Sequence, residues 1–324
     1  PILRLYGPDG LTLQAADDNG LVNGNALIHY TATGTGRVYL AAVSGETGNY
    51  AVSASLGPKA SFDAQMMAGI LDSHSHWSNA PGSGSVLSYG FAETNVQALP
   101  GFQPFSEAQE DSTRAVLAQV SELANVSFVE ADGDDAVLLY GNYHDPADTA
   151  VSIGGLPGDG DFAALAGDVW LNTATPPTDL TLPGSTAFRA LLQAVGHSLG
   201  LTAPGLHSSA GPAVSYAADA LFWQDSRQFT VMSTFAANEV TGPGLPAGIG
   251  GAALEPDTLG IADMLALHQI YGQNSTTRLG DDTYGFGSNL GGVYDFDQNF
   301  DPMLTIWDAG GFDTLDLWRY SADQ

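Results

Sequence analysis

The sequence has no cysteine and very little positive charge. Its 324 residues include 8 lysines and arginines against 36 aspartates and glutamates, which gives a formal net charge of −28 at pH 7. The missing cysteine excludes disulfide bonds and thiolate metal sites, and no apolar run approaches the ~20 residues that a membrane-spanning helix needs. Because an acidic surface repels nucleic acids and anionic membranes, we expect divalent cations or basic molecules as partners.

The composition fits two cellular settings. A cysteine-free, acidic chain rich in glycine and aspartate suits export to a calcium-rich exterior, and it suits a halophilic cytosolic protein nearly as well. The length is sufficient for two or three domains with a sizeable core. Because the chain opens at Pro1 without a methionine or a secretory leader, we expect its true start to be missing or processed away.

Residues 1 to about 56 form short segments of alternating polarity separated by turn formers, which predicts an all-β unit of antiparallel strands. The segments LRLYGPDG, DDNG and TGNYAVS, together with Tyr39, resemble the later part of the pre-peptidase C-terminal domain, a small β-sandwich that accompanies secreted proteases. Asp17, Asp18 and Asn19 offer oxygens to a calcium ion. Since aspartate and asparagine so often form turns, we prefer a solvated turn here.

The passage from Gly57 to about Ser85 is rich in glycine, serine and proline, which predicts a linker. It contains the segment DSHSHW, where His74 and His76 alternate and would share one face of an extended chain. A metal site is one interpretation of this pair. Because no third ligand is evident beside them, we prefer a polar loop.

The stretch from Phe188 to Pro204, FRALLQAVGHSLGLTAP, predicts a buried helix with a sharp end. Its apolar residues recur at helical spacing, and Ser185 or Thr186 can cap its N-terminus. Gly200 suits the left-handed residue that ends a helix.

This stretch resembles the metzincin zinc motif H-E-x-x-H-x-x-G-x-x-H, in which three histidines bind zinc and the glutamate is the general base. His197 and Gly200 match the motif. Gln193 stands at the first ligand, Ala194 at the base and Ala203 at the third ligand. The resemblance therefore implies a zinc site without two of its ligands and without its base, so we expect neither zinc nor a catalytic residue here.

Further motifs resemble the serralysin family, the secreted calcium-dependent metzincins. In DSRQFTVMSTF, Met232 corresponds to the methionine beneath the zinc, and Thr234 stands where the family has a tyrosine that can reach the metal. More matching segments stand in the order of the family: FSEAQEDSTRAVLAQVSELANVSFVE, GDVWLN, IADMLALHQIYG, TTRLGDDTYGF and IWDAGGFDTLDL. The resemblance runs from about Ala68 to the C-terminus.

The resemblance implies an α+β fold. We expect a partial pre-peptidase-C-terminal-like β-sandwich over 1–57, a linker over 58–85, a metzincin-like domain with a mixed twisted sheet and long helices over 86–275, and the start of a calcium-binding β-roll over 276–324. Ser106 and Gln109 form the pattern of a capping box at the start of an amphipathic helix.

The resemblance also assigns two groups of binding residues. In the metzincin fold, GDVWLN is an edge strand at the substrate cleft, where a peptide or protein adds itself by backbone hydrogen bonds. Its residues are Gly167, Asp168, Val169, Trp170, Leu171 and Asn172. The calcium-binding positions of the β-roll correspond to Arg278, Gly280, Asp281, Thr283, Asp308, Gly310 and Asp313. Oxygen ligands on flexible turns suit this hard cation.

Two functions compete. The first is a secreted, calcium-binding pseudopeptidase that has lost zinc and base and keeps its cleft for binding or structure. The second is a secreted zinc-dependent metalloendopeptidase with non-standard ligands, for which His207 is a nearby candidate. Because zinc catalysis needs about three protein ligands and a base, we prefer the first. A serine mechanism through Ser198, Ser208 or Ser209 has little support, because the chain has no G-x-S-x-G segment.

Overall fold

The structure of this chain is a computed structural model. It describes residues 2–17, 28, 30, 37–43, 59, 62–148, 152–158, 165–175, 180–205, 214–240 and 254–320. The interpretations of Asp18, Asn19, His207, Ser208 and Ser209 lie outside the described residues. The described part contains sheets of three, five and two strands together with several helices, so the expected mixture of helices and sheets is confirmed.

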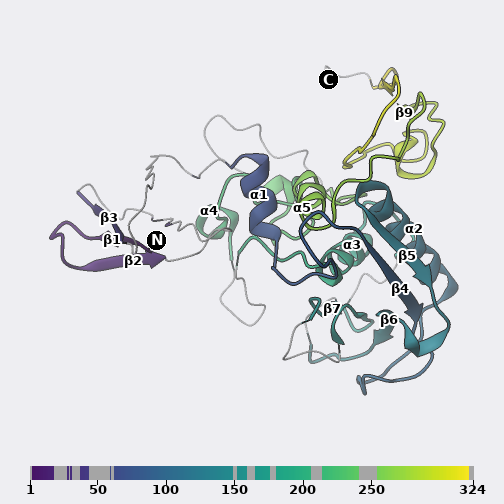
Figure 1. The fold of residues 1–324 in the computed structure, drawn as a ribbon, viewed down its shortest axis with the longest axis horizontal. Coiled ribbons are helices and arrows are strands. Elements are labelled where there is room, and N and C mark those ends of the chain that lie inside the picture. Colours follow the sequence, from purple (N-terminus) through teal and green to yellow (C-terminus); the bar gives the residue numbers. More distant parts are fainter. Residues whose placement is uncertain are drawn as a thin grey trace.

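The largest sheet has five strands (Figure 1). Its strand order is β5-β4-β6-β8-β7, and neighbouring strands are parallel except β7 with β8. The strands are β4 (Ser85–Phe91), β5 (Val126–Glu130), β6 (Leu138–Tyr143), β7 (Ser152–Gly154) and β8 (Val169–Asn172). The segment GDVWLN therefore forms a strand, as expected.

The position of β8 corrects the prediction that GDVWLN is an edge strand. β8 lies between β6 and β7, and Val169 stands opposite Tyr140 on one side and opposite Gly154 on the other. Its backbone groups therefore pair with two neighbours, and all four of its residues are buried. Within the described sheet, β7 is the outer strand on this side. A peptide that extends the sheet here would pair with β7.

Helices from distant parts of the chain share one hydrophobic core with the sheet. They are α1 (Ala64–Leu71), α2 (Glu107–Leu123), α3 (Thr186–Ser198) and α5 (Ile261–Tyr271). The short helix α4 (Tyr216–Asp219) instead places Tyr216 in a separate cluster with Phe235. Val116 of α2, Leu191 of α3 and Leu87 of β4 belong to this core. Trp170, which is 0% exposed, belongs to a separate cluster with Leu139. Because Trp170 is flanked along β8 by residues of the main core, the two clusters occupy opposite faces of the sheet.

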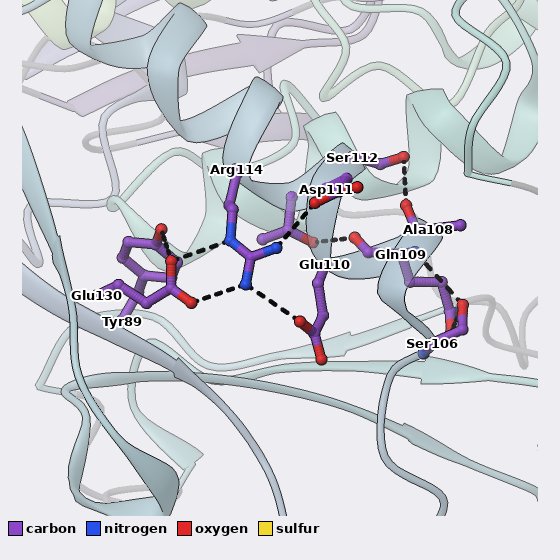
Figure 2. A network of polar contacts seen from close by, with 10 residues as sticks. Tyr89, Ser106, Ala108, Gln109, Glu110, Asp111, Ser112, Arg114 and Glu130 are labelled. Atoms are coloured by element: carbon purple, nitrogen blue, oxygen red, sulfur yellow. Dashed lines mark hydrogen bonds and ion pairs between the residues drawn. The ribbon is translucent and has the colours of Figure 1, made fainter.

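A charged network ties α2 to the sheet (Figure 2). Ser106 caps the helix, and its Oγ accepts from Gln109 N at 3.4 Å in the predicted capping box. Arg114 donates Nε to Glu130 Oε2 at 2.9 Å and Nη2 to Glu130 Oε1 at 2.7 Å, which joins α2 to β5 by a bidentate pair. Tyr89 of β4 donates to the same carboxylate at 2.7 Å. These hydrogen bonds, led by those from Arg114, lower the pKa of Glu130 to about 2.

Much of the segment predicted as a linker is folded into the core. α1 packs against α5 and carries Met67 and Leu71 into the main core, where Phe62 joins them. The linker prediction over 58–85 is therefore wrong for residues 62–71, because these apolar side chains outweigh the glycines and serines that follow them. The other domain boundaries stay predictions.

Smaller sheets form near the two ends of the described chain (Figure 1). The N-terminal sheet has the order β2-β1-β3 and is antiparallel throughout. Its strands are β1 (Ile2–Tyr6), β2 (Leu13–Asp17) and β3 (Tyr39–Val43). Towards the C-terminus, β9 (Thr283–Gly285) and β10 (Thr314–Asp316) pair in parallel. Short antiparallel strands are thus confirmed at the N-terminus, while a complete sandwich stays a prediction. Among the described helices, none has both the length and the apolar character needed to cross a membrane.

Candidate functional site

α3 carries the residues that match the zinc motif, and it begins and ends as predicted. Ser185 Oγ accepts from Phe188 N at 3.1 Å and caps the helix. After the helix the chain turns at Gly200, whose φ is +97°, and Leu201 N donates to Gly196 O at 2.9 Å. Side chains disfavour such a backbone conformation, so glycine is required at this turn.

Met232 packs directly against α3. Its Sδ lies 2.9 Å from the position that a Cβ on Gly196 would occupy, so this approach requires a glycine in the helix. Asp263 of α5 holds the turn that carries Met232, because its carboxylate accepts from Thr230 Oγ1 at 2.5 Å and from Val231 N at 2.8 Å. Burial raises the pKa of Asp263 to about 6.

Gln193 is held by a neighbour on its own helix. Arg189 Nη1 donates to Gln193 Oε1 at 2.5 Å, and Arg189 Nε lies 3.5 Å from Glu255 Oε2. Glu255 also accepts from Arg227 Nη1 at 2.9 Å, so one buried carboxylate serves two guanidinium groups. Burial, and then the charge of Arg227, lower the pKa of Arg189 to about 10. A positive charge beside Gln193 opposes a second cation at this position.

The side chains at the motif positions do not supply a zinc ligand set. His197 contributes the single imidazole, and its buried Nδ1 has no hydrogen-bond partner among the described residues. Burial lowers the pKa of His197. Ala194 and Ala203 carry no side-chain donor atom, Thr234 is exposed, and the side-chain oxygen of Gln193 is already hydrogen-bonded. Zinc requires about three nitrogen, oxygen or sulfur ligands from the protein, so these residues do not fit the ion.

A second group of ligand-type side chains lies in the loop after α1. Asp72, His74 and His76 each bring one potential ligand atom to within 4.8 Å of the others. The loop contacts the α3 turn, since a Cβ on Gly200 would lie 2.3 Å from Ser75 O. The alternation of the histidines is visible in the sequence, whereas the approach of Asp72 is not. The spacing D-x-H-x-H places Asp72 near the histidines in sequence, but only the bend of the loop brings its carboxylate to them.

The two turns predicted to bind calcium meet in the structure. Asp282 N donates to Asp313 Oδ1 at 3.0 Å. Asp282, Asp308 and Asp313 each bring a carboxylate oxygen to within 4.8 Å of the others, which fits a hard cation. The carboxylate of Asp281 accepts from Phe312 N at 2.8 Å, and its assignment as a calcium ligand stays a prediction. Asp282 is therefore a candidate ligand that the resemblance did not include. The other assigned positions on these turns are Arg278, Gly280, Thr283 and Gly310.

The side chains assigned to the substrate cleft mostly contact their own chain. The carboxylate of Asp168 accepts from Gln97 Nε2 at 2.9 Å and from Leu139 N at 3.2 Å, and burial raises its pKa to about 6. Asn172 donates its amide to Asp145 O at 3.0 Å. These residues hold the strand in place, and a role in peptide binding stays a prediction.

Known proteins resemble most of this chain. The family described as Peptidase M10 serralysin C terminal matches residues 273–324. Metallopeptidase AprA of Pseudomonas marginalis is 32% identical over 255 residues, which cover 75% of this chain and 52% of that protein. Serralysin G of Dickeya chrysanthemi is 33% identical over 258 residues, which cover 75% and 51%. Serralysin of Proteus mirabilis is 33% identical over 234 residues, which cover 68% and 46%. The chain spans about half the length of these relatives.

Proposed function

Because this chain is a homologue of the serralysin family of metallopeptidases, we propose that it is a calcium-binding member that binds no zinc at α3 and does not hydrolyse peptides there. Serralysins are secreted extracellular proteases, and the expected secreted location follows from this relationship. The proposed role of the former cleft is to bind a peptide or a protein, or to serve the structure.

The observation that carries the proposal is the state of Gln193. Its side-chain oxygen accepts a hydrogen bond from Arg189, so a positive charge lies beside the position of the first zinc ligand. Ala194 stands at the position of the general base, and Ala203 stands at the position of the third ligand. A metal-bound water needs three ligands around the ion and a base to take its proton, and this donor set provides one imidazole.

The alternative is a zinc-dependent metalloendopeptidase with non-standard ligands. Two observations favour it: the relatives named above are called metallopeptidase or serralysin, and Asp72, His74 and His76 lie against the turn that ends the motif. This alternative predicts activity that depends on these three side chains.

The experiment measures hydrolysis of an unfolded protein substrate by the full chain in calcium, with and without added zinc. We expect no hydrolysis that a zinc-selective chelator removes. Chelator-sensitive hydrolysis that His197→Gln abolishes would overturn the proposal, and the same activity abolished by His76→Gln would establish the alternative.

Restoration of the motif is the converse test. The variant Gln193→His, Ala194→Glu, Ala203→His should bind one zinc ion more than the wild type if the helix and turn retain the family geometry. Because Arg189 opposes a cation here, adding Arg189→Gln should strengthen zinc binding further. If neither variant takes up extra zinc by elemental analysis, the overlay of the motif on α3 is wrong.

A further inference from the structure

We propose that Asp72, His74 and His76 form a binding site for a divalent ion of the zinc class, separate from the motif on α3. One ligand atom from each side chain lies within 4.8 Å of the others. Two imidazoles and a carboxylate are a ligand set that zinc uses in proteins. The two sites share no side chain, so this proposal does not rest on the proposed function.

Each histidine already lies near the separation from Asp72 that one shared ion requires. His76 Nε2 donates to Asp72 Oδ1 at 2.7 Å, and His74 Nδ1 lies 3.6 Å from Asp72 Oδ2. Ligands about 2.1 Å from a tetrahedral zinc ion are about 3.4 Å from one another, so both separations are within about 1 Å of the required value. When the ion binds, it replaces the proton that His76 and Asp72 share in the hydrogen bond.

The loop that carries the three ligands is fixed to the end of α3. Ser73 N donates to Gly200 O at 3.0 Å, and Trp77 Nε1 donates to Ser198 O at 2.7 Å. These bonds flank the loop on both sides of the histidines. The backbone of the site is therefore held before any ion arrives, which lowers the entropic cost of binding.

Two further contacts place the site beside the sheet. Asp72 pairs with Leu201 in an antiparallel bridge, and Ser75 Oγ donates to Pro157 O in the connection between β7 and β8. The loop that would hold the ion thus contacts two other parts of the chain, the α3 turn and the segment after the outer strand β7.

The site is shielded on one side and open on the other. The side chains of Asp72 and His76 are 15% and 18% exposed, whereas that of His74 is 66% exposed. Three protein ligands leave a fourth position of a tetrahedral ion for water. Imidazole ligands favour zinc, cobalt, nickel or copper over calcium, which prefers oxygen. The site therefore differs in chemistry from the carboxylate group formed by Asp282, Asp308 and Asp313.

The experiment titrates the full chain with zinc chloride alone, by calorimetry, in calcium that saturates the oxygen sites. The visible absorption of added cobalt chloride reports the coordination geometry separately. The variants are His74→Asn, His76→Gln and their combination. Asparagine is chosen at position 74 because its φ is +62°, a conformation that asparagine tolerates. Controls are His144→Asn, which removes an exposed histidine outside the group, and His197→Gln.

We expect one zinc ion per chain, with an affinity that falls by about 100-fold in each single variant and is undetectable in the combination. Removal of a hydrogen-bond partner that only supports a ligand lowers metal affinity by about 10–100-fold, so the expected loss lies at the upper end of that range. Cobalt should give the intense absorption of a four-coordinate ion in the wild type and in both controls. Thermal unfolding of each variant without zinc verifies that it is folded.

The proposal is overturned if the wild type binds no zinc, or if the folded combination variant binds zinc as the wild type does. Loss of binding in His197→Gln with retention in the combination variant would place the ion at α3 and would contradict the proposed function as well. Equal loss in His144→Asn would show non-specific binding to surface histidines, and it would also overturn the proposal.

Discussion

The turn at Gly200 should be the most sensitive glycine position in the segment that resembles the zinc motif. Replacement by alanine introduces two separate costs. The φ of +97° disfavours any side chain, and the new Cβ would lie 2.3 Å from Ser75 O and 3.4 Å from His76 Cδ2. Since the nearest atom belongs to the backbone, the loop after α1 must move as a whole.

A matched control separates these two costs. Gly82 has a φ of +73°, and a Cβ there would meet no atom within 4 Å. Gly82→Ala should therefore lower the free energy of unfolding by about 1–2 kcal/mol, the cost of placing a side chain in the left-handed conformation. Gly200→Ala should cost this amount plus about 1–3 kcal/mol for the overpacked contact. The difference between the variants measures the contact between the α3 turn and the loop.

Urea unfolding in saturating calcium provides the measurement, with midpoints compared at equal slope. The calorimetric zinc titration is then repeated on both variants, and we expect weaker binding in Gly200→Ala alone, because the displaced loop carries Asp72 and both histidines. If the two alanine variants lose the same free energy of unfolding, the loop does not pack on Gly200 as the structure describes, and the argument for a pre-formed metal site fails with it.

Two further predictions concern buried and clustered carboxylates. The pKa of Asp263 is raised to about 6 by burial, so its protonation stabilises the folded state fully below the unfolded pKa near 4, and this contribution is lost as the pH rises through about 6. The free energy of unfolding of the wild type should therefore fall by about 3 kcal/mol relative to that of Asp263→Asn as the pH rises from 4 to 7. Denaturant unfolding measures this difference, and a difference that does not change with pH would contradict the reasoning. Calcium at a hundredfold excess over its Kd should add about 2.7 kcal/mol. Asp308→Ala should remove most of the resulting rise in melting temperature, whereas Asp132→Asn, an exposed aspartate after β5, should keep it. A melting temperature that is the same in calcium and in excess chelator would exclude the carboxylate site.

The local structure of α3 was predictable because its signals lie next to one another in the sequence. Ser185 caps the helix and Gly200 ends it, and both act on residues within a turn of themselves. The same holds for the capping box of Ser106 and Gln109. The resemblance to the serralysin family was also predictable, because it depends on the order of motifs along the sequence and not on contacts between distant residues.

The errors arose where a distant contact outweighs local composition. The segment before Ser85 is rich in glycine and serine, yet α1 is folded because Met67 and Leu71 reach the core beside α5. The edge of the sheet was misplaced because β7 has three residues, too few to show an alternating pattern. The part that Asp72 plays beside the histidines is likewise set by a distant contact, because the loop bends back against Leu201.

The contacts around the α3 turn do not depend on the residues at the zinc-motif positions. Tyr271 of α5 donates its hydroxyl to Leu199 O at 2.8 Å, and Thr202 N donates to Leu71 O at 2.8 Å. Met232 fills the space beside Gly196. None of these contacts uses a zinc ligand or the catalytic base, so replacement of those residues leaves the turn supported by three other segments of the chain. The turn is therefore available to hold the loop with Asp72, His74 and His76, whether or not α3 itself binds a metal.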